Sequence, residues 1–116
     1  LIPFYNDPII VDVSTANAVI TLNMGYTRER YFSLSPIIAA PRTLQLISDS
    51  RARSINIKFS INAAVPLTLP DDFVMSNALF NDATKEWTPL DTGAYTITAW
   101  YDGTNWNASI VGPDNV

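Results

Sequence analysis

Hydrophobic and polar residues alternate with a period of two along most of the chain. The alternation is clearest in residues 54–61, where three isoleucines and Phe59 share one side and serine, asparagine and lysine share the other. Successive side chains of an extended strand point to opposite faces, so this pattern predicts half-buried β-strands. The same pattern covers residues 18–24, 31–34, 43–47, 95–101 and 106–111.

No segment of about a dozen residues repeats its hydrophobic positions with the helical period of 3.6. Prolines at 36, 41, 66, 70 and 89 interrupt the candidate segments, and we expect residues 72–85 to form a long loop. Short strands separated by turn residues are typical of two packed sheets. The sequence therefore predicts an all-β fold, an antiparallel β-sandwich of jelly-roll type with few or no helices.

The length of 116 residues suits one domain. We assign residues 15–112 to the sandwich, residues 1–14 to an extended N-terminal arm or linker, and residues 113–116 to a C-terminal tail. The arm carries two prolines, begins with Leu1 and shows no secretory signal, so we expect the chain to be part of a longer polypeptide.

For one hairpin the sequence predicts which residues pair across the two strands. Asp102, Gly103, Thr104 and Asn105 form a turn signal, in which Gly103 can adopt a positive φ, so Tyr101 should face Trp106. A shift by one residue would turn Trp106 outward, which favours this register. It places Ala99 opposite Ala108 and Ile97 opposite Ile110 on one face, and Thr98 opposite Ser109 and Trp100 opposite Asn107 on the other.

Composition argues against several classes of function. The chain has no cysteine and no histidine, so thiol chemistry and histidine-based catalysis are excluded. The adjacent carboxylates Asp71 and Asp72 follow Pro70 and indicate a polar turn rather than an acid/base pair. No spacing typical of a calcium loop or a phosphate loop occurs, and the net charge is −4. We expect no enzyme activity, cofactor, metal, nucleic acid or membrane insertion.

Two groups of residues are candidates for binding. Trp87 lies in a polar stretch and Trp100 on the polar side of the predicted hairpin, and an exposed tryptophan beside amides is typical of carbohydrate recognition. A tryptophan on this side can equally pack against a loop or a neighbouring subunit. The second group is Tyr26, Arg28 and Arg30, a composition found at interfaces and also in solvated turns.

The order of segments resembles a known family. Residues 42–46, 54–59, 65–70 and 93–100, followed by Tyr101–Trp106, resemble the small β-sandwich domains of tailed-bacteriophage appendage proteins, namely tail fibres, tail-tip proteins and head fibres. The hairpin Tyr101–Trp106 is the most specific motif of this resemblance. The chain departs from the family at residues 48–53, where a charged segment replaces the usual glycine-rich turn.

The resemblance implies a non-enzymatic virion protein on the phage surface, made in the bacterial cytoplasm. It further implies a homotrimer that binds other virion proteins through its N-terminal arm, and that attaches to host-surface glycan or decorates the particle. Two alternatives remain open from the residues: a carbohydrate-binding module of a polysaccharide-active protein, and an assembly chaperone or capsid-surface plug.

Overall fold

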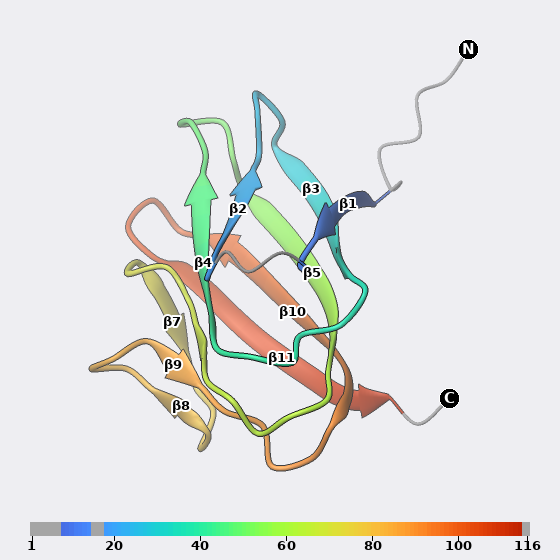
Figure 1. Cartoon of the computed structure of the whole chain (residues 1–116). Helices are drawn as coiled ribbons and strands as arrows, with labels where there is room; N and C mark the ends of the chain where they lie inside the picture. Colours follow the sequence, from blue (N-terminus) through green and yellow to red (C-terminus); the bar gives the residue numbers. More distant parts are fainter. Residues whose placement is uncertain (1–7, 15–17, 115–116) are drawn as a thin grey trace.

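The computed structural model describes residues 8–14 and 18–114. Within these ranges the chain forms strands and no helix, in two sheets that pack face to face (Figure 1). This confirms the all-β sandwich. The strands are β1 (Ile9–Asp12), β2 (Val19–Asn23), β3 (Glu29–Ser35), β4 (Arg42–Ile47), β5 (Ser54–Ile61), β6 (Leu67–Thr68), β7 (Phe73–Met75), β8 (Phe80–Asn81), β9 (Glu86–Trp87), β10 (Gly93–Tyr101) and β11 (Trp106–Asp114).

The first six strands alternate between the two sheets. The six-stranded sheet has the order β1-β3-β5-β10-β11-β7 and the five-stranded sheet the order β2-β4-β6-β9-β8. In Figure 1, β2 and β4 cross in front of β5 and β10. The N-terminal half of the chain therefore winds around the sandwich, and each circuit of this winding adds one strand to each sheet.

This winding makes the strand pairing mixed rather than antiparallel throughout. β1–β3, β3–β5, β2–β4, β4–β6 and β11–β7 are parallel, whereas β5–β10, β10–β11, β6–β9 and β8–β9 are antiparallel. Parallel neighbours need a crossover connection, which in many proteins is a helix. Here a strand of the opposite sheet is the crossover, so the pairing depends on which sheet each loop enters. Periodicity carries no information about that choice.

The two ends of the sandwich lie outside the bounds expected from sequence. β1 pairs with β3, and Val13 is buried with its N–H donating to Ser35 O at 2.8 Å, so residues 9–13 belong to the domain rather than to a linker. β11 continues to Asp114, two residues into the expected tail. The arm's residues 1–7 and the tail's residues 115–116 lie outside the described ranges.

Residues 72–85, expected to be one long loop, contain β7 and β8. Phe73 is buried and stacks on Trp106, with ring centroids 5.9 Å apart. The strands are only three and two residues long, too short for an alternating pattern to show. Asp71 and Asp72 form the expected turn, closed by Phe73 N–H donating to Pro70 O at 3.0 Å.

The predicted hairpin is confirmed in every pair, from Tyr101 opposite Trp106 to Ile97 opposite Ile110. Further along, the register shifts between Ala94 and Thr96, where Gly112 adopts a φ of +143°. This is a β-bulge, and it keeps Tyr95 directed into the core while the strand bends.

The core lies between the sheets and contains two groups of aromatic rings. Trp87 packs against Tyr95 and Phe59, with ring centroids 4.9 Å and 6.0 Å away. Trp106 packs against Phe73 and Tyr101 near the β10–β11 turn. Edge-to-face and offset arrangements of this kind add to the stabilisation from burial alone.

We predict that Gly112→Ala lowers the free energy of unfolding by about 2–3 kcal/mol. An added Cβ would lie 2.6 Å from Tyr95 Cδ2 and 2.7 Å from Ala94 O, in a backbone conformation that alanine disfavours. Chemical denaturation measures the loss. Gly103→Ala is the matched control, because Gly103 also has a positive φ but nothing lies within 4 Å of its added Cβ. Equal losses in the two variants would contradict the steric explanation.

Candidate functional site

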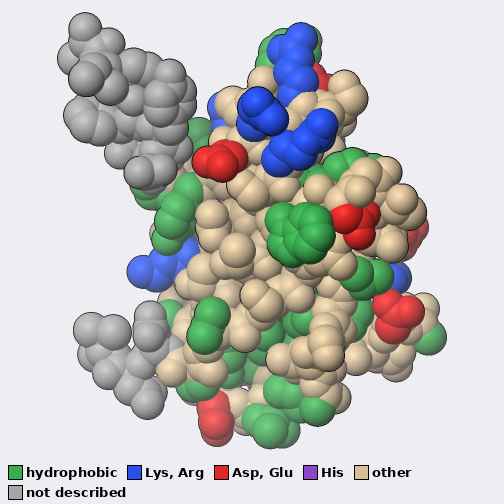
Figure 2. Space-filling model, turned by 180° about the vertical axis from the view of Figure 1, so that it is seen from behind, with side chains coloured by type: hydrophobic (Ala, Val, Ile, Leu, Met, Phe, Trp, Pro, Cys, Tyr) green, Lys and Arg blue, Asp and Glu red, His purple; other side chains and the backbone are tan. Residues whose placement is uncertain are grey.

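The outer face of the six-stranded sheet carries an exposed tryptophan among uncharged polar side chains. Ile97 and Ala99 point into the core, so the intervening Thr98 and the following Trp100 point outward, and 57% of Trp100 is exposed. Asn107 of β11 lies beside Trp100 on one side and Ser54 of β5 on the other. Figure 2 shows this face from outside, with isolated hydrophobic side chains among polar atoms and basic side chains at its upper end.

Hydrogen bonds fix the polar groups around the tryptophan. Thr98 Oγ1 donates to Asn56 Oδ1 at 3.0 Å, across from β10 to β5. Asn107 Nδ2 donates to Asp102 Oδ2 at 2.9 Å. We call Tyr31, Asn56, Thr98, Trp100 and Asn107 the sheet platform; all five side chains share this face by strand register.

The two aromatic residues of the platform are spaced for an extended ligand. Tyr31 lies two strands from Trp100 and one row further along, because Asn56 pairs with both Tyr31 and Thr98. From ordinary sheet dimensions, their Cα atoms are about 12 Å apart. A short oligosaccharide spans this distance. Flat aromatic rings with planar amides between them can stack on sugar rings and hydrogen-bond their hydroxyls.

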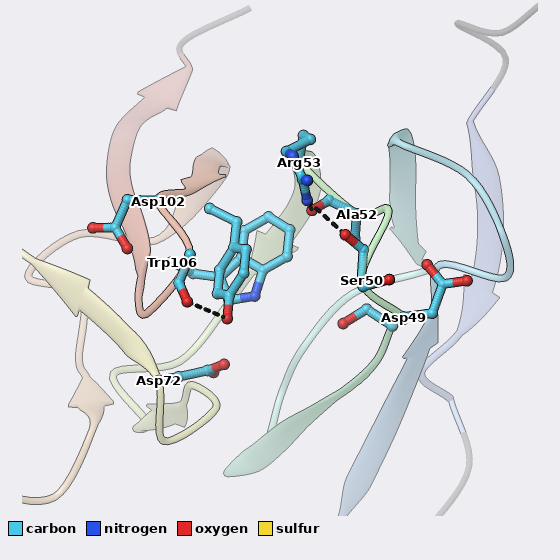
Figure 3. A pocket seen from close by; sticks show the side chains of 10 residues that line it. Asp49, Ser50, Ala52, Arg53, Asp72, Asp102 and Trp106 are labelled. Carbon is cyan, nitrogen blue, oxygen red and sulfur yellow. Dashed lines mark hydrogen bonds between the residues drawn. The ribbon is translucent and has the colours of Figure 1, made fainter.

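A groove of about 670 Å³ lies beside the β10–β11 turn, between residues 48–53 and Asp72; we call it the hairpin groove. Figure 3 shows Arg53 and Asp72 across from each other with Trp106 between them. Arg53 Nη1 donates to Ser50 O at 2.8 Å and to Ala52 O at 2.9 Å. The groove thus has a fixed guanidinium on one wall and a carboxylate on the other.

Asp102 lines the hairpin groove but serves the turn. Its carboxylate accepts hydrogen bonds from the Asn105 N–H at 2.8 Å, the Asn107 side-chain amide at 2.9 Å and the Thr104 N–H at 2.8 Å. These donors, in that order, hold the pKa of Asp102 below its ordinary value of 3.8. Asp102 is therefore an acceptor rather than a proton donor. Among the described residues, no three acidic side chains gather to hold a metal ion, and no helix is long and apolar enough to cross a membrane.

Trp87 does not offer a binding surface. It is 1% exposed and packs in the core, so the interpretation of this residue as an exposed sugar plate is wrong. Its polar neighbours in sequence indicated exposure, but β9 has only two residues, one of which faces inward. Two residues are too few for an alternating pattern of hydrophobic and polar side chains to indicate which side is buried.

The second predicted group lies in and beside the β2–β3 loop. Tyr26 is 78% exposed, and the guanidinium carbon of Arg51 lies 5.4 Å from the centroid of its ring. Tyr26, Arg28 and Arg53 line a further groove of about 580 Å³, which we call the arginine groove. Arg30 Nη1 donates to Asn23 O at 3.4 Å.

The fold brings together residues that are distant in the sequence. Arg53 lines the same groove as Arg28, although the two residues lie in different loops of the chain. Sequence reasoning also missed Asn56 and Thr98 as site residues. The alternation in residues 54–61 and 95–101 already placed both on polar faces, and only the β5–β10 register was lacking.

We predict that alanine substitution destabilises the fold strongly at Trp87 and only slightly at Trp100. Trp87→Ala should lower the free energy of unfolding by about 3–5 kcal/mol, because it removes a fully buried ring. Trp100→Ala should change it by less than about 1 kcal/mol, because more than half of that side chain is in solvent. Urea denaturation monitored by far-UV circular dichroism compares them. A comparable loss in Trp100→Ala would assign that residue to the core instead.

A pH dependence follows from Asp102. Because its folded-state pKa lies below 3.8, the stabilisation is present at neutral pH and is lost as pH falls through that lower value. Asp102→Asn should therefore lose less stability than the wild type as pH falls from neutral to below 3.8. Asp12, whose pKa is lowered by hydrogen bonds from Ser14, stays in both proteins, so the slope becomes smaller without vanishing. Identical slopes would contradict the role of the turn.

Comparison of the chain with protein-family models, curated proteins and solved structures finds no match. The resemblance to phage appendage domains expected from sequence stays a prediction, which rests on short segments of the chain, chiefly Tyr101–Trp106. This hairpin is a folding element, as its register and its Asp102 turn indicate. The candidate binding surfaces are the sheet platform, the hairpin groove and the arginine groove.

Proposed function

We propose that this protein is a non-enzymatic domain of a bacteriophage virion appendage, of tail-fibre or head-fibre type, that contributes to attachment by binding host-surface glycan. The observation that carries the glycan-binding part is the exposure of Trp100 on the outer sheet face, beside the uncharged polar residues Ser54, Thr98 and Asn107. The resemblance of Tyr101–Trp106 and the preceding segments supports the appendage assignment.

The physical case for a glycan begins with the platform's composition. A sugar ring has an apolar face and a rim of hydroxyl groups, so it matches an aromatic ring surrounded by amides and hydroxyls. Asn56 and Asn107 are held by hydrogen bonds before a ligand arrives, which limits the entropy lost on binding. No carboxylate belongs to the platform that could serve as a catalytic pair across a glycosidic bond.

A homotrimer and a place at the particle surface complete the proposal. Uncharged polar residues cover much of both outer faces, with Thr21, Thr43 and Gln45 exposed on the second sheet. Exposed apolar residues remain at other positions, including Ile10 and Val111 on the outer face of the six-stranded sheet. Such residues are candidates for burial between subunits or against other virion proteins.

The same platform favours a second candidate, a carbohydrate-binding module of a polysaccharide-active protein. Both candidates use Trp100, but they differ in assembly, since a module of that kind acts as a monomer. Light scattering of the purified domain over a range of concentrations distinguishes them. A stable trimer supports the appendage domain, and a monomer at every concentration contradicts the proposed trimer and favours the module.

We predict that Trp100→Ala weakens glycan binding by at least about tenfold. A glycan array identifies the ligand and titration calorimetry measures the affinity. Thr43→Ala is the control, because Thr43 is exposed on the outer face of the five-stranded sheet, away from the platform. Unchanged affinity in Trp100→Ala would contradict the platform. Dissociation of a wild-type oligomer by the same substitution would instead assign Trp100 to a subunit contact.

A further inference from the structure

Positive charge is concentrated at one end of this acidic protein. The net charge is −4, yet four of the five arginines, Arg28, Arg30, Arg51 and Arg53, lie in or next to the β2–β3 and β4–β5 loops. In Figure 2 the blue side chains gather at the upper end of the six-stranded sheet. The β2–β3 and β4–β5 loops lie next to each other in the fold and bring these residues together.

Arg28 and Arg53 are held side by side by the backbone. The N–H groups of Arg53 and Ser54 both donate to Arg28 O, at 2.7 Å and 3.0 Å. Their side chains line the arginine groove together with Tyr26, Thr27 and Glu29. The groove thus contains two guanidinium groups, one carboxylate and one aromatic ring.

The guanidinium groups of Arg28 and Arg53 differ in their hydrogen bonds within the protein. Nη1 of Arg53 is bound to the carbonyl groups of Ser50 and Ala52, which orients its planar fork. Within residues 8–14 and 18–114, no side-chain hydrogen bond or ion pair involves Arg28. Arg51, by contrast, lies over Tyr26 and 4.0 Å from Asp49. Arg28 and Arg53 therefore remain able to bind an anion.

The arginine groove adjoins the sheet platform. Glu29, Ser54 and Trp100 form one row across β3, β5 and β10. Arg28 directly precedes Glu29, and Arg53 directly precedes Ser54. In addition, Tyr101, the neighbour of Trp100, donates its N–H to Arg53 O at 2.8 Å. The backbones of Arg28 and Arg53 thus lie one residue beyond the row that contains Trp100, and Glu29 of that row also lines the arginine groove.

We propose that the arginine groove binds an anionic substituent, a carboxylate or a phosphate, of the saccharide whose ring packs on Trp100. This inference rests on the proposed glycan-binding function and adds that the ligand is acidic. Guanidinium forks match the geometry of both anions, and such charge-assisted hydrogen bonds are stronger than neutral ones. Because the groove is open to solvent, its contribution should fall as ionic strength rises.

The test is an array of uronate-bearing and phosphate-bearing oligosaccharides, each printed beside its neutral counterpart, either carboxyl-reduced or dephosphorylated. We expect the wild type to prefer acidic members by about fivefold at low salt, and Arg28→Gln to remove this preference. Lys58→Gln is the matched control, because it removes the same charge from an exposed position on the same sheet face, outside the groove. It should keep the preference.

The outcomes separate this inference from the proposed function. Preferential binding of one acidic class, lost in Arg28→Gln and kept in Lys58→Gln, supports the inference and identifies the anion. Equal binding of acidic and neutral members overturns the anionic site while leaving the glycan platform in place. An equal loss in Arg28→Gln and Lys58→Gln also overturns it, because the effect would then be general charge. No glycan binding by the wild type overturns both.

Discussion

The hydrogen bonding of β10 along both of its edges is the constraint on which the rest of the structure depends. β10 pairs with β5 over eight residues and with β11 through the hairpin. These two ladders fix which of its side chains face the core, and Ile97 and Ala99 are completely buried as a result. Once those positions face inward, Trp100 can only face outward. The sheet platform is therefore a by-product of burying the opposite side of the same strand.

The winding of the N-terminal half has a second effect on the surface. Because strands of one sheet are crossovers for the other, the β2–β3 and β4–β5 loops both cross at the same end of the sandwich. Residues more than twenty positions apart, such as Arg28 and Arg53, then share a groove.

Sequence predicted those parts of the fold that local physics determines. Residues 54–61 match β5 at both ends, and the hairpin register follows from the turn residues together with the need to bury Trp106. The parallel pairings were missed because period-two alternation defines a strand's inner side but not its neighbour. Trp87 was misread for a related reason: its burial depends on packing against Phe59 and Tyr95 of the other sheet, and the two-residue strand β9 has no alternating pattern that would indicate its inner side. For the candidate site, sequence supplied Trp100, Tyr26 and Arg28, whereas their grouping with Asn107 and Arg53 required the tertiary structure.

The Asp102 turn links the folding of the hairpin to the orientation of a side chain in the sheet platform. One oxygen of its carboxylate accepts the N–H groups of Thr104 and Asn105, while the other accepts the side-chain amide of Asn107. The same side chain that closes the loop therefore sets the rotamer of a residue that faces a prospective ligand. Loss of this carboxylate would free Asn107 to sample several orientations in an intact fold. Under the proposed glycan binding, affinity would then fall because ordering Asn107 would cost entropy at the moment of binding.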